Sequence, residues 1–313
     1  MLACGSDVPA PRHTQSQHAP FAEVALSFDA LPYQLDINLN PRMSDPNEQK
    51  DISTKMIAAL SAAQVPATVF AICGKLPQSQ GLARQWQQEG YTIGNYGKNA
   101  LDPNLATIEQ WSEEVAQCQS KIKKVDAKTK GWFRYPNLTQ GWTKEKDKAL
   151  TKALSDMALV PVPATIPVLD HLYNIAYEGA LNERKSTFAN TIAAQYIEHV
   201  RQSIKIAKEL SFRRRSMTTP HIARLHVNRL NADHLPQLIE QLKSDDIRFI
   251  SVHEAMQDPI YHEPNAYFGR ANKSWLNRVS PLPNSHEESW FGNAAWRITH
   301  QYPQYLGEAQ NEK

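Results

Sequence analysis

Apolar residues are distributed along the chain in two alternating patterns, which predict strands and helices in turn. Short runs of apolar and small residues lie at 23–32, 67–74, 90–96, 132–136, 158–162, 222–226 and 247–252. Runs of this length without strict alternation are typical of strands that are covered on both faces of a parallel sheet. The pattern therefore predicts a sheet with a buried core.

Between these runs, apolar residues recur at the spacing of a helix face. Segment 108–125 is the clearest example, because Trp111, Val115, Cys118 and Ile122 follow one another at intervals of three or four residues. Further helices are predicted at 48–63, 78–89, 144–154 and 235–243, the last preceded by Asn231 as a possible N-cap, with a helical insertion at about 171–212. Strands that alternate with helices of these lengths indicate parallel pairing through right-handed connections.

Polar side chains stand at or near the ends of several predicted strands. The first strand ends at Asp29, and later ones carry Tyr96, Arg134 and His226. In α/β barrels the carboxyl ends of the strands carry the chemistry, so Asp29 is a candidate catalytic residue. An Asp that merely caps the following turn would fit the same position.

Together these segments resemble the polysaccharide deacetylase family, of the NodB-homology or carbohydrate esterase type. In that family the first strand ends in Thr-Phe-Asp-Asp, the third in His-x-x-x-His, the fourth carries Arg-x-Pro, and a late strand ends in Leu-His or Leu-x-x-His. The matching segments here are 27–30, 96–100, 134–136 and 225–226. The resemblance implies an α/β fold, a distorted seven-stranded (β/α) barrel over 21–278, with the helical insertion at about 171–212.

The family also uses a divalent metal such as zinc, and the residues that would bind it are changed in this chain. The positions of the second Asp and of both His are Ala30, Tyr96 and Ala100. Alanine offers no ligand atom, and a neutral phenol replaces imidazole poorly. A site rebuilt from His221 and His226 is disfavoured, because residues five apart on a strand point to opposite faces. We therefore predict no metal and no other cofactor.

Residues implied to transfer protons are retained. By resemblance Asp29 matches the general base, Arg134 its tether and His226 the general acid, and Asp170 completes the candidate catalytic set. A general base alone contributes on the order of 10²–10⁴-fold, whereas a metal both activates water and stabilises the oxyanion. Candidate sugar contacts around the presumed cleft are Tyr96, Trp132, Tyr135 and Pro136.

Three functions fit these residues. The first is a pseudo-enzyme that binds an N-acetylated polysaccharide or a peptidoglycan-type glycan without cleaving it. The second is an active carbohydrate N- or O-deacetylase, a hydrolase of amide or ester bonds that uses Asp29 and His226. The third is a protein-interaction module on a relic scaffold, in which Asp29 and Arg134 form a structural ion pair.

Charge and hydropathy exclude some partners. The 34 basic and 32 acidic side chains give a net charge of +2 spread along the chain, which does not favour nucleic-acid binding. No stretch approaches the roughly 18 apolar residues that a membrane span needs. Any membrane contact is therefore expected only through the N-terminus.

The first residues resemble the end of a bacterial lipobox, with Cys4 as the lipidated residue and 1–20 as a flexible tether. Either the chain was trimmed to this point and Met1 added, or the match is chance. The first alternative implies a protein of the bacterial envelope that faces the periplasm. There Cys73 and Cys118 could pair, although Cys73 would also suit a buried thiol. The aromatic-rich tail at 279–313 is expected to pack onto the barrel or to bind sugar.

Overall fold

A single parallel sheet forms the centre of the molecule. The computed structural model describes residues 21–32, 45–74, 76–127, 129–270, 273–280 and 286–306. Seven strands follow the order β5-β4-β3-β2-β1-β7-β6, and an eighth, β8, pairs with β1. The strands are β1 (Ala22–Leu31), β2 (Ala67–Ala71), β3 (Thr92–Asn95), β4 (Trp132–Phe133), β5 (Val160–Pro161), β6 (Ile166–Pro167), β7 (His221–His226) and β8 (Ile247–Phe249).

The sheet curls into a half-barrel of the predicted (β/α) type, and all of its described pairs are parallel. The described residues contain eight strands, whereas the sequence predicted seven. The additional strand is β6, whose two residues are too few to give a readable pattern. No pairing joins β5 to β6 among the described residues, so the barrel is open between them.

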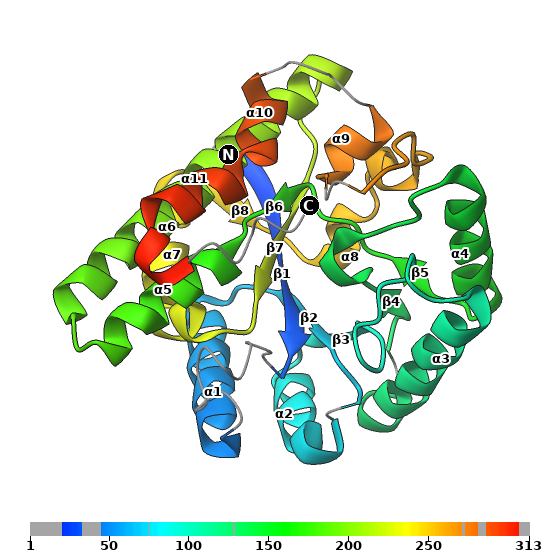
Figure 1. Cartoon of the computed structure of the whole chain (residues 1–313), viewed down its shortest axis with the longest axis horizontal. Coiled ribbons are helices and arrows are strands. Elements are labelled where there is room, and N and C mark those ends of the chain that lie inside the picture. Colours follow the sequence, from blue (N-terminus) through cyan, green and yellow to red (C-terminus); the bar gives the residue numbers. More distant parts are fainter. Residues whose placement is uncertain are drawn as a thin grey trace, which may run out of the picture.

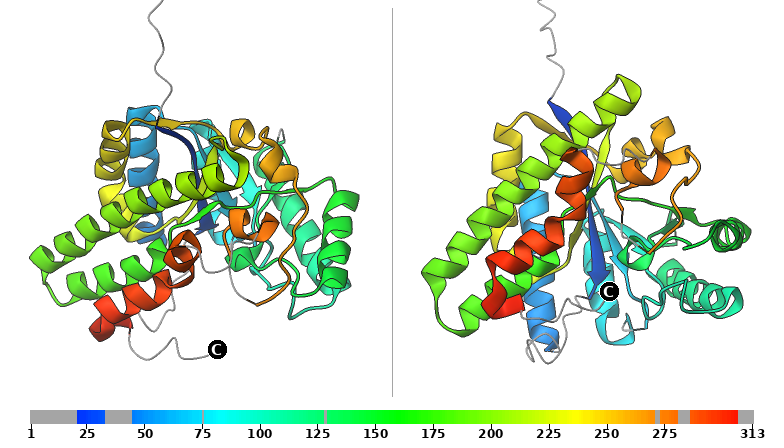
Figure 2. Two further views of the ribbon diagram at one scale, coloured as in Figure 1. Left: turned by 90° about the horizontal axis from the view of Figure 1, so that it is seen from above. Right: turned by 45° about the horizontal axis from the view of Figure 1, so that its top comes forward.

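Helices surround this sheet (Figures 1 and 2). In Figure 1, α1 and α2 lie below it, α3 and α4 at the right, and α5, α6 and α11 at the left. Their bounds are α1 (Pro46–Ala63), α2 (Leu76–Gln88), α3 (Ile108–Val125), α4 (Lys144–Asp156), α5 (Asp170–Asn182), α6 (Ser186–Arg215), α7 (Arg229–Ser244), α8 (Val252–Ala255), α9 (Trp275–Val279), α10 (His286–Gly292), α11 (Ala294–Gln301) and α12 (Pro303–Leu306), with 3-10 turns at Pro136–Leu138 and Pro259–His262. In the described part of the chain, no helix combines the length and apolar character needed to cross a membrane.

Local sequence explains where these helices begin. Thr107 and Gln110 form a capping box at the start of α3, and the predicted apolar face of that helix is buried. Helix α7 begins earlier than predicted, since its N-cap is Asn228 and not Asn231. The side chain of Asn228 accepts a hydrogen bond from the backbone N–H of Asn231 at 2.8 Å. Asn231 is thereby freed for the contacts described below.

The helical insertion is a pair of helices, α5 and α6, which carries part of the aromatic tail. Tyr302 is buried, with its ring centroid 6.0 Å from that of Tyr173 and 6.4 Å from that of Phe188. Trp290 stacks on His199 of α6 at 5.7 Å. The packing interpretation holds for these residues, whereas Trp296 is 62% exposed. The N-terminal segment with Cys4 lies outside the described residues.

A disulfide links Cys73, just after β2, to Cys118 of α3. Both side chains are buried in the main core. Of the two alternatives for Cys73, the structure therefore has the paired one.

Candidate functional site

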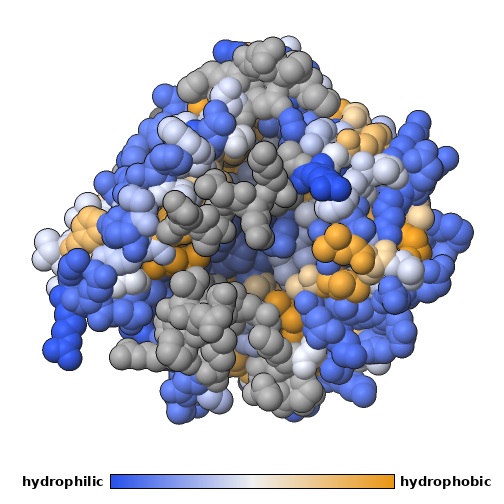
Figure 3. Space-filling view, viewed as in Figure 1, coloured by the Kyte–Doolittle hydropathy of each residue, from blue (hydrophilic) through white to orange (hydrophobic). Residues whose placement is uncertain are grey.

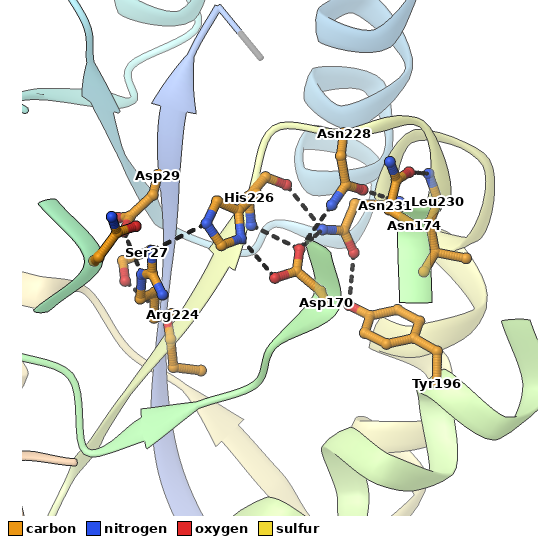
Figure 4. Close-up of polar contacts among 12 residues, drawn as sticks. Ser27, Asp29, Asp170, Asn174, Tyr196, Arg224, His226, Asn228, Leu230 and Asn231 are labelled. Carbon is orange, nitrogen blue, oxygen red and sulfur yellow. Dashed lines mark hydrogen bonds and ion pairs between the residues drawn. The ribbon is translucent and has the colours of Figure 1, made fainter. Parts of the chain in front are cut away.

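Two neighbouring strands bring the first candidate residues together. Asp29 of β1 lies directly opposite His226 of β7, and Ser27 lies opposite Arg224. Because side chains two residues apart on a strand share a face, all four point into the same region. Figure 4 shows this group next to Asp170 at the start of α5.

Asp29 is fully buried between two guanidinium groups. Its Oδ1 lies 3.6 Å from Nη1 of Arg134, the residue predicted to tether it. Its Oδ2 accepts a 2.5 Å hydrogen bond from Nε of Arg224, which the sequence analysis did not assign to the site. Arg134 also donates to Oγ of Ser27 at 2.8 Å. Asp29 therefore has two cationic partners, of which only Arg134 was predicted.

Arg224 is the centre of the site. Its Nη2 lies 3.4 Å from Oη of Tyr96 and 3.1 Å from Nε2 of His226. Burial alone would lower the pKa of Arg224, but the neighbouring Asp29 and Tyr96 raise it above its ordinary value. Burial and the Asp29 charge likewise raise the pKa of Tyr96, so its phenol stays protonated. One fixed positive charge thus touches the candidate base, the candidate acid and Tyr96.

The hydrogen bonds of His226 define its tautomer. A guanidinium can only donate, so Nε2 of His226 accepts from Arg224. Nδ1 therefore carries the proton and donates to Oδ1 of Asp170 at 2.7 Å. These contacts place Nε2 against a cation and Nδ1 against a carboxylate.

Asp170 is anchored by several donors besides the ring of His226. Its Oδ2 accepts from the backbone N–H of His226 and from the side-chain amides of Asn228 and Asn231, each at 2.8 Å. Asn231 in turn accepts from Oη of Tyr196 at 2.6 Å. Burial alone would raise the pKa of Asp170, but the contacts with His226 lower it to about 2. Asp170 is thus an ionised, fully bonded carboxylate.

The predicted sugar contacts are less accessible than expected. Tyr96 is only 4% exposed, and its Oη accepts from the backbone N–H of Asn137. Tyr135 is 5% exposed and stacks on Trp111 at 5.9 Å, while the adjacent Pro136 is also buried. The burial of Tyr96 and Tyr135 therefore leaves little of either aromatic ring available to a sugar.

Trp132 does not join the site. It is 8% exposed and lies at the start of β4, with its ring centroid 6.4 Å from that of His253. The hollow that it lines is bounded by the segments that precede β2 and β3, at the amino ends of the strands. Asp29 lies at the opposite end of the sheet. A sugar contact by Trp132 in the same cleft as Asp29 is not supported by this placement.

The side chains present do not fit a divalent metal ion at the family position. Ala30 and Ala100 have no donor atom, the Tyr96 hydroxyl is engaged by Asn137, and the guanidinium of Arg224 lies against Tyr96 and Asp29. The positive charge of this guanidinium would repel a metal cation at the family position.

A second group, Asp170, His171 and His226, has potential ligand atoms within 4.8 Å of one another. The oxygens of Asp170 already accept four hydrogen bonds. Arg224 lies 3.1 Å from Nε2 of His226. Binding a metal there would break the anchoring network and bring two cations together.

Sequence reasoning placed Asp29, Arg134, Asp170 and His226 at the site but missed Arg224. A signal was present, because Arg224 precedes His226 by two residues and must share its face of β7.

Comparison with known proteins agrees with this architecture. The family model described as polysaccharide deacetylase matches residues 17–157. No curated protein matches the sequence. Among solved structures, the CE4 family pseudoenzyme from Bacillus anthracis has a TM-score of 0.53 at 12% identity, covering 76% of this chain and 66% of that one. A mutant of this pseudoenzyme with restored enzymatic activity has a TM-score of 0.54 at 13% identity, covering 76% and 69%.

A polysaccharide deacetylase from Bacillus cereus has a TM-score of 0.53 at 16% identity, covering 74% of this chain and 91% of that one. At these identities the structural matches show the fold. The fold and site thus define a NodB-type (β/α) barrel whose metal position is altered. The family match over residues 17–157 and the shared fold support a divergent member of the polysaccharide deacetylase family.

Proposed function

We propose that this protein is a pseudo-enzyme of the bacterial envelope that binds an N-acetylated glycan without hydrolysing it. The observation that carries this proposal is the position of Arg224, which contacts both Asp29 and His226. The family acts on acetylated glycans such as peptidoglycan or chitin-like polysaccharides, and this supports the ligand class. Lipidation at Cys4 would hold the protein at the membrane facing the periplasm.

Arg224 opposes general base catalysis by Asp29. A general base must reach the proton of the attacking water within about 2.6–3.2 Å. Here one oxygen of Asp29 accepts from Arg224 and the other faces Arg134. Arg224 therefore occupies one of the two oxygens that would accept the proton, and the other oxygen lies against a second guanidinium group.

Arg224 also opposes general acid catalysis by His226. An imidazole that protonates a leaving amine must donate from the nitrogen that faces the substrate. In this site Nε2 accepts from Arg224, while the proton on Nδ1 is directed to Asp170. Protonating Nε2 would place a second positive charge 3.1 Å from the guanidinium.

A second candidate function, an active deacetylase, is favoured by the intact Asp170–His226 pair. It requires Arg224 to move away from both groups when substrate binds. Acetate release from N-acetylated oligosaccharides distinguishes the two functions, and we expect none above background. The control variant is His253→Gln, which changes an exposed histidine outside the site. Acetate release that is lost in His226→Gln but retained in His253→Gln would contradict the pseudo-enzyme assignment.

We expect the purified protein to retain no stoichiometric divalent metal, and elemental analysis after dialysis tests this. The triple substitution Ala30→Asp, Tyr96→His and Ala100→His should still bind none, because Arg224 remains. Adding Arg224→Leu should create zinc binding. The φ angles of Ala30 and Ala100 are 62° and 57°, in the left-handed region that Asp and His tolerate better than most residues. Zinc retained by the triple variant with Arg224 in place would show that this guanidinium does not block the site.

A further inference from the structure

A small cavity lies where the barrel is open, beside the site described above. Its volume is about 50 Å³, and its walls come from the segment after β4, the connection from β5 to β6, and α9. Arg134 lines it, as do Tyr135 and Arg278. Nothing in the proposed function uses this space.

Three residues that line this cavity each carry a buried polar atom with no hydrogen-bond partner among the described residues. These atoms are Nε of Arg278, Oη of Tyr135, and Nε of Arg134. Their residues are 3%, 5% and 0% exposed, respectively. Buried polar groups in folded proteins are nearly always satisfied, so three orphaned donors around one cavity indicate a missing acceptor.

Arg278 is the buried residue at this cavity that most requires an acceptor. Its Nη2 donates to the backbone carbonyls of Gln140 at 2.9 Å and Tyr267 at 3.3 Å. No carboxylate in the described part of the chain forms an ion pair with it, although every other arginine of the site has one. Burial lowers the pKa of Arg278, and the nearby charge of Asp147 offsets this effect only in part. A buried charge without a counter-ion is costly, and an anion in the cavity would offset this cost.

The remaining walls define the kind of anion. Leu138, Val162, Ala164 and Trp275 present apolar surface to the cavity. Inorganic phosphate or sulfate would place charged oxygens against this apolar surface, which is unfavourable. An aliphatic acid places its methyl or methylene groups there instead. The volume exceeds the roughly 10–15 Å³ that one water molecule needs, but it admits only a few non-hydrogen atoms.

We propose that this cavity binds the carboxylate of a small aliphatic acid, of the size of acetate to lactate, with Arg278 as its principal cationic partner and Tyr135 as a hydrogen-bond donor. The ammonium group of Lys273, which also lines the cavity, adds positive charge at its partly exposed side. Arg134 would connect the bound acid to Asp29, because its Nη1 lies 3.6 Å from that carboxylate.

Ligand-observed NMR with ¹³C-acetate on the wild-type protein tests the proposal. Sodium chloride keeps the ionic strength constant as the acetate concentration changes. For so small a ligand we expect a Kd of roughly 0.1–10 mM. Arg278→Gln should weaken binding at least about tenfold, as expected for loss of a charge-assisted contact. The matched control is Arg84→Gln, which removes an exposed guanidinium from α2 and should leave acetate binding unchanged.

A second variant keeps the test decisive if Arg278→Gln fails to fold. Ala164→Val fills part of the cavity without altering any charge and should reduce acetate binding. Absence of acetate, propionate and lactate binding to the wild type at about 100 mM would overturn the proposal. So would equal binding by Arg278→Gln, or tighter binding of inorganic phosphate. Tighter binding of glucuronate than of acetate would show that the carboxylate belongs to an acidic sugar instead of a small free acid.

Discussion

Lowering the pH from 7 to 5 should reduce the free energy of unfolding by about 6 kcal/mol through three buried histidines. Burial lowers the pKa of His199 and that of His221 to about 4 each, and that of His171 to about 3. The unfolded chain therefore binds more protons between pH 6.5 and 4. The stabilisation is complete above about pH 6.5 and is lost as the pH falls towards 4, with about 2 kcal/mol lost per histidine at pH 5.

Urea unfolding followed by circular dichroism at the two pH values measures this loss. His221→Phe should remove about a third of it, because His221 is 1% exposed and an apolar ring of similar size cannot take up a proton. The exposed His253→Gln is the matched control and should leave the difference unchanged. Equal stability at pH 7 and pH 5 would show that none of the three imidazoles needs to be neutral in the folded chain.

Replacing Asp29 by asparagine should destabilise the protein by about 3–5 kcal/mol, which corresponds to a fall in Tm of about 5–8 °C. The substitution keeps the shape of the side chain but leaves Arg134 and Arg224 buried as two positive charges without a counter-ion. Arg134→Ala should cost less, about 1–3 kcal/mol, because Asp29 keeps its contact with Arg224. Differential scanning calorimetry of the wild-type protein and of the two variants measures the fall in Tm for each substitution.

A double variant separates the charge effect from lost packing. Adding Arg224→Met to Asp29→Asn removes one of the two uncompensated charges, so the double variant should be more stable than the sum of its single changes predicts. Asp51→Asn is the surface control, because Asp51 is half exposed in its pair with Lys55 and should contribute little. Strict additivity in the cycle would mean that Asp29 and Arg224 do not interact energetically.

The barrel was predictable because its strands differ so clearly from its helices. β1 and β7 are almost entirely buried, so apolar residues are required along their whole length. β6 escaped prediction because it has two residues and ends at Pro167, and its pairing with β7 depends on the tertiary fold. Residues with strong local patterns were therefore placed correctly, and those defined by distant partners were not.

The site was predictable only in part, for a related reason. A family resemblance placed Asp29, Arg134 and His226 together, but it carried no information on a residue that the family pattern does not specify. Strand periodicity put Arg224 on the same face as His226, yet only the structure shows that its side chain reaches Asp29. The exposure of Tyr96 depends on loops that cover it, which alternation along a strand cannot reveal.

The place of β1 in the sheet has a consequence for how the chain reaches its native state. It is the first strand in sequence, but its partners include β7 and β8, and the hydroxyl of Ser27 bonds the backbone of Ala223, 196 residues away. A fragment that ends at residue 157, where the family model ends, would expose one edge of β1 as an unpaired apolar strand and would be prone to aggregate. The sheet can close only after most of the chain has been synthesised, so folding should be slow and should depend on keeping this strand protected until β7 is available.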